Sequence, residues 1–474
     1  MKQSRLLARV RFLRRDLGLG RTASISLSAA GVLAASLFFP TAFPQSITSS
    51  FGGGGGQQGN PTDPGVRTGA PGAGQPLPGL TAPQLEYFNQ GLEAFNEVIF
   101  VQNPPPGGDA GLGPRFNSDS CVSCHAAPAV GGSSPAVNLQ IASATAMGGR
   151  NRIPSFLRPN GPTLEVRFKN NPDGTADGGV HALFSIAGRS DAAGCNIRQD
   201  DFSNTSNLAF RIPTPVFGAG LIEAIPDSTL KSNLNNNAAL KSTLGISGKL
   251  NTSGNDGTVT RFGWKAQNKS LHIFAAEAYN VENGVTSDLF PQERDETPGC
   301  LFNTTPESSL DFQTGAADDP TVFAAFMALL APPSRGTITA SVTNGAQVFS
   351  QVGCNLCHTP SLQTGTNPIA ALSQQPVNLY SDLAVHGMGP GLAEGVSQGN
   401  AGGDEFRTAP LWGLGQRVFF LHDGRTNNLL QAIQAHSSQG AGGIRASEAN
   451  GVIRRFNQLS NADQQSLLNF LRSL

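Results

Sequence analysis

Two short stretches of the chain carry the residue types and spacing with the most specific chemistry. Residues 120–129 read SCVSCHAAPA and residues 353–362 read GCNLCHTPSL. Each has two cysteines separated by two residues, with a histidine directly after the second, which is the pattern of c-type haem attachment. The spacing lets two thiols bond to the two vinyl groups of one porphyrin edge while the imidazole reaches the iron. The sequence therefore predicts two covalently bound haem c groups, held by Cys121, Cys124 and His125 and by Cys354, Cys357 and His358.

Other chemistries of paired cysteines fit this chain less well. A redox disulfide of the thioredoxin type would follow a strand of a parallel sheet, and neither pair does. A zinc site made from two such pairs usually has about 15 to 20 residues between them, whereas more than 200 residues separate these two. The remaining cysteines, Cys195 and Cys300, are expected to form a disulfide in an oxidising compartment, with two free thiols as the alternative.

The ligand on the far side of an iron decides the task of its haem, because a sixth protein ligand favours electron transfer and an open position favours chemistry. For the second haem the residues leave three candidates, His386, Met388 and His436. A thioether ligand such as Met388 would raise the reduction potential. For the first haem the candidates are His181 and Met147, and neither lies in a distinctive pattern.

Two arginines are candidates to bind haem propionates. Arg407 and Arg425 follow the second motif, and a guanidinium group pairs with a carboxylate through two parallel hydrogen bonds. The alternative is that both are ordinary surface arginines.

The start of the chain predicts export. Its first 21 residues hold seven basic residues and one acidic residue, and the uncharged run ISLSAAGVLAASLFF follows at 25–39. This order is typical of a secretory signal, with an uncleaved membrane anchor as the alternative, so we expect a periplasmic or otherwise exported protein. The rest of the chain has 25 basic and 32 acidic residues, a net charge of −7, which argues against a nucleic-acid-binding surface.

Composition and periodicity divide the chain into four segments. Residues 1–45 are the expected signal or anchor, and residues 46–81 are rich in glycine and proline and predict a flexible linker. Residues 82–335 are expected to form the first haem domain, with a large loop-rich insertion. Residues 336–474 are expected to form a second, cytochrome c-like haem domain.

Apolar residues at three- and four-residue spacing predict helices next to both motifs, over 82–100 and from about 338. Further helices are expected at 227–236, 269–282 and 320–331, and at the end of the chain, where Ser460 or Asn461 is the expected cap. Few segments alternate with a period of two. We therefore expect a mainly α protein with two cytochrome c-like haem domains and long irregular loops.

Several longer stretches resemble one family. These are RIPTPVFGAGLIEAIP at 211–226, SVTNGAQVFSQVGCNLCHTPSL at 341–362 and DEFRTAPLWGLGQRVFFLHDGRTNNLLQAIQAHS at 404–437. They are similar to the di-haem oxidoreductases, a peroxidase-like family also called thiol oxidoreductases and distantly related to bacterial di-haem cytochrome c peroxidases. The resemblance extends over roughly residues 82–474 and is most specific after residue 340.

The resemblance implies a ligand for the second haem. In the peroxidases an HDG turn precedes, by about fourteen residues, the methionine that ligates this haem. Here HDG occupies residues 422–424 and the matching position is His436, so the resemblance favours His436 over Met388 and His386. His422 itself is expected to have a structural role or to contact a propionate.

The resemblance also implies that the first haem is the reactive one and that an acid/base lies beside it. Glu223, in the apolar stretch GAGLIEAIP, is the candidate, because burial would raise its pKa. The alternative is a structural carboxylate paired with an arginine such as Arg211. The relatives place a tryptophan between the two haems, and Trp412 is the candidate for this position, with Trp264 expected in the core.

Together these features predict an exported di-haem c-type cytochrome with oxidoreductase activity. The most concrete version is a peroxidase, in which electrons enter through one haem and hydrogen peroxide is reduced at the other. A pure electron-transfer cytochrome and a di-haem oxygenase acting on an organic substrate are the alternatives. The expected partners are an electron-donor protein, such as a small cytochrome or cupredoxin, and a small-molecule oxidant or substrate. We expect no nucleic acid, and membrane contact only through an uncleaved anchor.

Overall fold

The computed structural model describes residues 59–474 except residues 312 and 314. Within it, Asn60–Leu474 forms one compact unit. The expected signal or anchor at 1–45 and the start of the predicted linker lie outside the described residues. In the described part, no helix is both long enough and apolar enough to cross a membrane.

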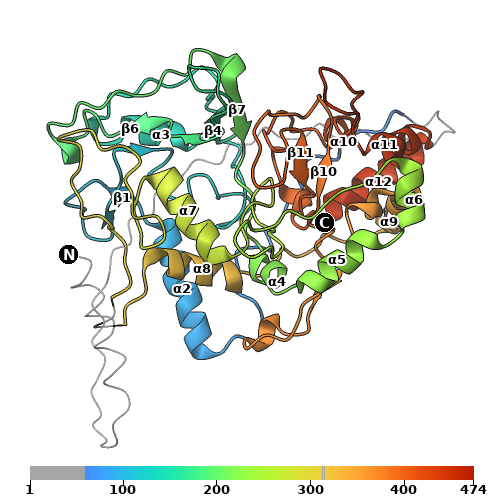
Figure 1. Cartoon of the computed structure of the whole chain (residues 1–474). Helices are drawn as coiled ribbons and strands as arrows, with labels where there is room; N and C mark the ends of the chain where they lie inside the picture. The colour runs from blue at the N-terminus through green and yellow to red at the C-terminus, as the bar shows by residue number, and fades with distance from the viewer. Residues whose placement is uncertain (1–58, 312, 314) are drawn as a thin grey trace, which may run out of the picture. The chain divides into compact units, whose positions relative to one another are not determined.

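Helices supply most of the regular structure, as the sequence predicts, and the strands are short (Figure 1). The helices are α2 Ala82–Asn96, α3 Gln140–Thr145, α4 Ala219–Glu223, α5 Asp227–Asn235, α6 Ala238–Leu244, α7 Leu271–Asn283, α8 Asp319–Leu329, α9 Ala340–Val352, α10 Leu429–Gln434, α11 Asn450–Asn457 and α12 Asn461–Ser473. The strands are β1 Ile99–Phe100, β2 Asp109–Ala110, β3 Arg115–Phe116, β4 Glu165–Phe168, β5 Val180–His181, β6 Phe184–Ser185, β7 Leu208–Arg211, β8 Leu362–Gln363, β9 Pro376–Val377, β10 Val385–Gly387 and β11 Glu405–Arg407.

A crossing of α2 and α8 supports the first motif. Gly91 lies where the two helices come closest, and a Cβ atom there would clash with the carbonyl oxygen of Val322. On the same helix, the ring of Phe95 lies 5.0 Å from that of Phe326 on α8 and 5.8 Å from that of His125, measured between centroids. The close crossing therefore places an aromatic side chain directly against the histidine of the first motif.

The second motif has the same kind of support from α9 and α12. Gly345 lies at their contact, where a Cβ atom would overlap the carbonyl oxygen of Ser466. The ring of Phe349 lies 5.3 Å from that of Phe470 on α12 and 6.4 Å from that of His358. Both motif histidines thus pack against a phenylalanine that a glycine-mediated helix crossing holds in place.

The region of the chain between α2 and α8 is loop-rich, as predicted. Its largest sheet has three strands in the order β5-β4-β7, and both pairings are antiparallel. Cys195 and Cys300 form the expected disulfide, which restricts the unfolded chain and so stabilises this irregular region. The predicted helices at 227–236, 269–282 and 320–331 are confirmed as α5, α7 and α8, and Ser460 caps the closing helix α12 by accepting from the N–H of Asp463 at 3.1 Å.

Buried apolar side chains form two main clusters. The smaller one gathers around α9, α11 and α12. The larger one surrounds the first motif, but it also includes side chains from beyond residue 336, such as Leu379, Leu383 and Trp412. The predicted boundary at 335/336 therefore does not separate two hydrophobic cores.

Residues 60–81, the end of the predicted linker, pack against the rest of the unit. The N–H of Leu77 donates to the carbonyl of Leu329 at 2.7 Å, and the N–H of Arg67 donates to the carbonyl of Gly415 at the same distance. The glycine and proline content predicts flexibility, but a few specific hydrogen bonds decide that this segment is ordered.

Asp63 is the strongest of these anchors. Its carboxylate forms an ion pair with Arg472 of α12 at 2.7 Å, and the two side chains are only 6% and 5% exposed. The carboxylate also accepts from the N–H of Leu429, the first residue of α10, at 2.6 Å and from the N–H of Gly65 at 2.9 Å. Burial alone would raise the pKa of Asp63, but the hydrogen bonds from Arg472 and the backbone outweigh it and lower the pKa.

We expect Asp63→Asn to lower the free energy of unfolding by about 3 kcal/mol at neutral pH, because it leaves the buried charge of Arg472 without a carboxylate. Urea unfolding followed by circular dichroism measures this. Since the pKa of Asp63 is depressed, the difference from the parent protein should shrink as the pH falls below about 4.

The matched control is Asp423→Asn, which breaks an ion pair with Arg425, a side chain that is 40% exposed. This change should cost less than about 1 kcal/mol. An equally small loss for Asp63→Asn would mean that the segment 60–81 is not anchored through Asp63.

Candidate functional site

The first C-x-x-C-H motif forms a tight turn that borders a cavity of about 150 Å³, the first cavity. The N–H groups of Cys124 and His125 both donate to the carbonyl of Cys121, at 3.2 and 3.1 Å. The Nδ1–H of His125 donates to the carbonyl of Gly132 at 2.9 Å, which leaves the lone pair of Nε2 for another partner. All three motif residues line the cavity.

The second motif repeats this arrangement beside a cavity of about 220 Å³, the second cavity. Gly353, with φ of +100°, ends α9 and turns the chain into Cys354; this backbone conformation favours glycine. The N–H of His358 donates to the carbonyl of Cys354 at 2.9 Å, and its Nδ1–H donates to the carbonyl of Tyr380 at 3.0 Å. The motif cysteines and histidine again line the cavity.

Both turns fit a haem. Burial lowers the pKa of His125 and of His358 to about 4, so each imidazole is neutral at pH 7 with its tautomer set by a carbonyl, the form that ligates iron. Burial also raises the pKa of Cys121 and Cys354 to about 12. The four motif cysteines form no disulfide, and most of the side chains around both cavities are apolar.

The second cavity brings His436 and Met388, two of the three predicted ligands, together with His358. His436 follows the end of α10, and its Nδ1–H donates to the carbonyl of Ala432 at 2.8 Å. Burial lowers the pKa of His436, so its ring is neutral and its Nε2 is available. His436 therefore resembles the motif histidine His358: each ring is neutral and donates its Nδ1–H to a backbone carbonyl, which leaves Nε2 to face a ligand.

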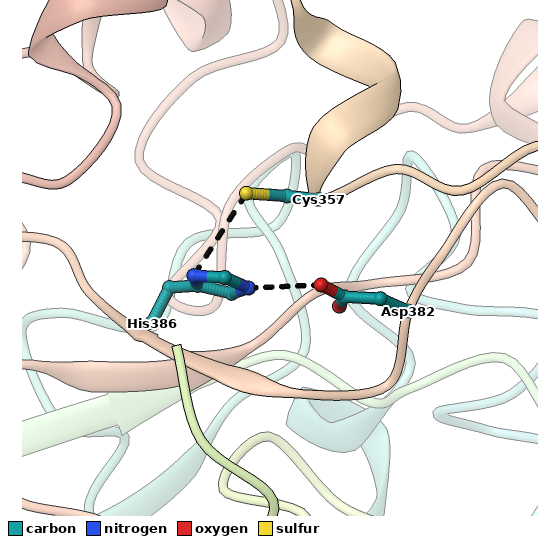
Figure 2. Close-up of side chains that lie close together, drawn as sticks. All are labelled: Cys357, Asp382 and His386. Carbon is teal, nitrogen blue, oxygen red and sulfur yellow. Dashed lines mark hydrogen bonds and ion pairs between the residues drawn. The ribbon is translucent and has the colours of Figure 1, made fainter. Parts of the chain in front are cut away.

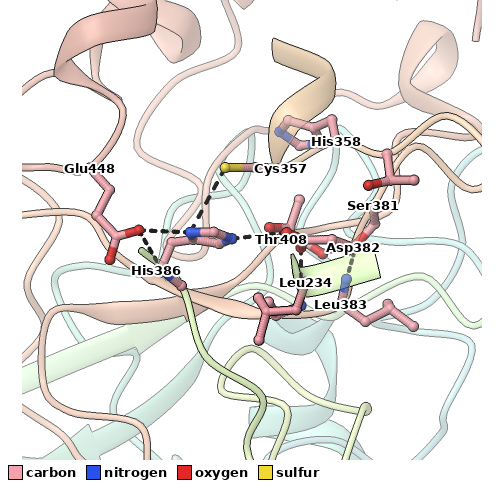
Figure 3. A network of polar contacts seen from close by, with 12 residues as sticks. Leu234, Cys357, His358, Ser381, Asp382, Leu383, His386, Thr408 and Glu448 are labelled. Carbon is pink, nitrogen blue, oxygen red and sulfur yellow. Dashed lines mark hydrogen bonds and ion pairs between the residues drawn. The ribbon is translucent and has the colours of Figure 1, made fainter. Parts of the chain in front are cut away.

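His386 also borders the second cavity, but both of its ring nitrogens are already bound. Nε2 lies 3.0 Å from Oδ2 of Asp382, and Nδ1 lies 2.9 Å from Oε2 of Glu448 (Figure 3). Burial opposes a positive charge on His386, but Cys357 and Asp382 outweigh it and raise its pKa well above the usual value. A histidine held between two carboxylates does not suit the role of an iron ligand, so the alternative assignment to His386 is disfavoured.

Cys357, Asp382 and His386 also form a group whose ligand atoms lie within 4.8 Å of one another (Figure 2). Such a group could hold a metal ion. The Sγ of Cys357 lies 3.8 Å from Nδ1 of His386, yet this sulfur belongs to the C-x-x-C-H turn and faces the second cavity. The group therefore fits better as support for the turn than as a separate metal site.

The two predicted propionate partners have different surroundings. Arg407 is 7% exposed and lines the second cavity, and its Nε has no hydrogen-bond partner among the described residues. Arg425 instead is largely exposed and pairs with Asp423, outside the residues that line either cavity. The prediction for Arg425 is therefore not supported by its position.

Arg417 is a further arginine of the second cavity that the sequence did not single out. It is 8% exposed, and its guanidinium makes no hydrogen bond in the described part of the chain. Burial lowers the pKa of both Arg407 and Arg417 to about 10, and for Arg407 the charge of Arg417 adds to the effect. Two buried guanidinium groups without a carboxylate fit an anionic group of a bound cofactor.

Glu223, the predicted acid/base, lies outside the residues that line the two cavities. Its Oε1 accepts a hydrogen bond from the N–H of Leu271 at 2.7 Å. It therefore satisfies the amino-terminal end of α7, and its burial raises its pKa without bringing it to the site. Arg211, the pairing partner considered in the alternative interpretation, instead binds Glu394.

Two other glutamates, Glu277 and Glu282 on α7, line the first cavity. The Nδ2–H of Asn117 donates to Oε2 of Glu282 at 2.9 Å. Burial, with the negative charge of Glu165 in addition, raises the pKa of Glu282 to about 8. Sequence reasoning missed both residues, although two acidic side chains within the mainly apolar helix 271–283 were a usable signal.

Neither predicted ligand of the first haem lies at the first cavity. His181 stacks on Phe168 and pairs with Asp177 at 2.9 Å, and Met147 is 42% exposed. Among the described residues, His125 is the one histidine that lines this cavity. The first cavity therefore differs from the second, which is lined by two further neutral histidines, His422 and His436.

The two buried tryptophans differ in the cavities that they line. Trp264 lines both the first and the second cavity, and a third, smaller cavity between their walls. Its Nε1–H donates to the carbonyl of Ile212 at 2.8 Å, and its ring meets the edge of His422 at 6.4 Å between centroids. Trp412 lines the third cavity but neither the first nor the second. Trp264, rather than the predicted Trp412, is thus the tryptophan shared by the two main sites.

Comparison with solved structures found partial likenesses. Hydrazine synthase of Kuenenia stuttgartiensis is 14% identical with a TM-score of 0.33, and the alignment covers 91% of this chain and 100% of that one. A MauG-like protein associated with microbial copper homeostasis is 16% identical with a TM-score of 0.29, covering 55% of this chain and 90% of that one. The diheme peroxidase BthA of Burkholderia thailandensis is 14% identical with a TM-score of 0.29, covering 45% and 65%.

No curated protein sequence matches the chain significantly. The family model described as "Di-haem oxidoreductase, putative peroxidase" matches residues 181–474, which include the second motif, α7 with its two glutamates, and Trp264. With this match over more than half of its length, the chain belongs to the di-haem oxidoreductase family.

Proposed function

We propose that this enzyme is an exported di-haem c-type cytochrome that reduces hydrogen peroxide in its first cavity and receives electrons through its second. The difference between the two cavities is the observation that carries the proposal. The second cavity holds His436 together with His358, whereas the first offers the carboxyl group of Glu282. Two histidines suit an iron that transfers electrons, and an acid/base suits a site where peroxide gains and loses protons.

The C-x-x-C-H turns would each hold one haem covalently. The two thiols of each turn would add across the porphyrin vinyl groups to give two thioether bonds, and the Nε2 of His125 or His358 would face the iron. In the second cavity, Arg407 and Arg417 would bind the propionates, which gives the unpaired Nε–H of Arg407 a charged partner.

A haem bound in the first cavity would supply an iron position for peroxide and electrons for cleavage of the O–O bond. The carboxylate of Glu282 accepts a proton from one peroxide oxygen and donates it to the other, which leaves as water. Asn117 orients this carboxyl group through its hydrogen bond to Oε2. In total, two electrons and two protons convert hydrogen peroxide into two water molecules.

Trp264 would carry electrons between the sites, because it is the side chain that borders both cavities. Its N–H is fixed by the carbonyl of Ile212, so the ring keeps its orientation. Trp412 instead packs against Gly218 in the core, so the proposal gives this tryptophan a structural role.

Export is supported by the basic and apolar start of the chain and by the Cys195–Cys300 disulfide, since disulfides persist in oxidising compartments. In such a compartment a small cytochrome or a cupredoxin would donate the electrons. Hydrogen peroxide is the proposed oxidant.

The test is turnover of the purified haem-loaded protein with hydrogen peroxide and a reduced small cytochrome. We expect a high-spin ferric component in the optical spectrum, and oxidation of two donor molecules for each peroxide consumed. Absence of turnover with any donor would contradict the proposal. Two low-spin haems that do not react with peroxide would indicate a pure electron carrier, and insertion of oxygen into an organic substrate would indicate an oxygenase.

Replacement of Glu282 tests the acid/base. We expect Glu282→Gln to lower kcat/KM for peroxide by about 10²- to 10⁴-fold. In the parent protein this rate should rise as the pH increases through the raised pKa of about 8, because the carboxylate is the form that accepts the proton. The variant should lack this rise in a stopped-flow pH profile.

Glu223→Gln is the matched control, because Glu223 also has a raised pKa but lies outside the cavities; its rate should be unchanged. If Glu277→Gln, rather than Glu282→Gln, removes the pH-dependent step, the acid/base is Glu277 and the assignment to Glu282 is wrong.

Replacement of His436 tests the second haem. We expect His436→Gln to abolish the low-spin signal of one haem in the optical and electron paramagnetic resonance (EPR) spectra, and to leave the other haem unchanged. Met388→Leu is the control at the same cavity and should leave both signals as they are. The opposite result, with a change only in Met388→Leu, would identify methionine as the ligand.

A further inference from the structure

Tyr279 is a buried phenol in the wall of the first cavity that peroxide reduction as described above does not use. It lies on α7, three residues before Glu282, and is only 3% exposed. Its ring meets the ring of Phe323 edge-on, with 5.1 Å between centroids. Because Phe323 lines the same cavity, the ring of Tyr279 is fixed between α7 and α8.

The hydroxyl of Tyr279 has a carboxylate partner. Its O–H donates to Oδ2 of Asp319, the first residue of α8, at 3.1 Å. The N–H of Asp319 donates to Oγ of Ser308 at 2.9 Å, which fixes the backbone that carries the carboxylate. Burial and the charge of Asp319 raise the pKa of Tyr279 well above its usual value, so the phenol keeps its proton until something removes an electron.

A phenol in this setting is prepared for one-electron oxidation. Loss of an electron makes a phenol strongly acidic, and oxidation is easiest when a base within hydrogen-bond distance takes the proton at once. The carboxylate of Asp319 is such a base, and it is half-buried, so it can later exchange its proton. Trp264 differs in this respect, because its N–H faces a backbone carbonyl, which does not accept a proton.

We propose that Tyr279 and Asp319 form a redox-active pair that supplies one of the two electrons used to reduce hydrogen peroxide in the first cavity. The inference rests on the proposed peroxidase function. Tyr279 loses one electron and its O–H bond breaks, the proton passes to Asp319, and a neutral phenoxyl radical remains. The second of the two electrons would come from the haem bound in the first cavity. One electron from the donor and the proton on Asp319 then restore the phenol.

The experiment mixes the haem-loaded protein with one equivalent of hydrogen peroxide, freezes it within milliseconds and records the EPR spectrum. We expect a tyrosyl radical signal that narrows when the protein is made with ring-deuterated tyrosine. In Tyr279→Phe the signal should fall at least tenfold. Asp319→Asn keeps a hydrogen-bond acceptor but removes the base, so its signal should also fall.

Tyr380→Phe is the matched control. The chain has three tyrosines; Tyr87 is 50% exposed on α2, and Tyr380 packs on Phe349 and Phe470 beside the second motif. The radical signal should persist in Tyr380→Phe. A signal that survives in Tyr279→Phe, or that does not change on deuteration of tyrosine, overturns the inference.

The outcomes separate this inference from the function on which it rests. If peroxide leaves the haem spectrum unchanged, the proposed peroxidase function fails and the inference fails with it. If the haem reacts with peroxide but no tyrosyl signal forms, the inference alone is wrong. Should Tyr279→Phe fold poorly, as thermal unfolding would show, the deuterium effect in the parent protein and the signal of Asp319→Asn decide the matter.

Discussion

The close approach of two helices at a glycine is the constraint on which both candidate sites depend. At Gly91 and at Gly345 a side chain would strike the backbone of the opposing helix, so each pair can only cross this tightly with glycine at the contact. The tight crossing brings Phe95 and Phe349 against the motif histidines. Because each turn is packed in this way, its cysteines and histidine face one enclosed cavity rather than solvent.

The two cavities share the same helix crossing beside the motif histidine, but the charged side chains that line them differ. The first is bordered by three glutamates and by Arg167 and Arg211, which already form ion pairs with Glu165 and Glu394. Burial and the charge of Glu165 raise the pKa of Glu282 to about 8. The second is bordered by Arg407 and Arg417, which lack a carboxylate partner in the described chain. Charges interact strongly in a poorly solvated interior, so these differences are the basis of the proposed division into a peroxide-reducing site and an electron-transfer site. Trp264, in the wall of both, is the natural connection between them.

Features that depend on a few consecutive residues could be predicted well. The C-x-x-C-H turns, the helices before and after them, the cap at Ser460 and the disulfide all follow from local pattern or from simple pairing. Predictions of individual site residues were less successful, because they depend on which face of a helix or loop lies against a cavity. Glu223 was a reasonable buried carboxylate, but it points to the end of α7 instead of a cavity, and Arg425 turns to its neighbour Asp423. The glycine- and proline-rich residues 60–81 are likewise ordered by distant partners such as Arg472.

The sequence by itself determined the two C-x-x-C-H motifs, the family resemblance and the positions of the main helices, because each of these depends on the spacing of residues close together in the chain. Only the tertiary structure decided which distant residues share a cavity with a motif. Glu282 lies 157 positions after His125, and nothing in its local sequence specifies that contact. His436, 78 positions after His358, was expected from the family resemblance, but only the fold places it at the second cavity. The physical reason is that a cavity wall is assembled by the packing of whole helices. Which cavity a side chain lines therefore depends on how its helix packs and on which face of that helix the residue lies.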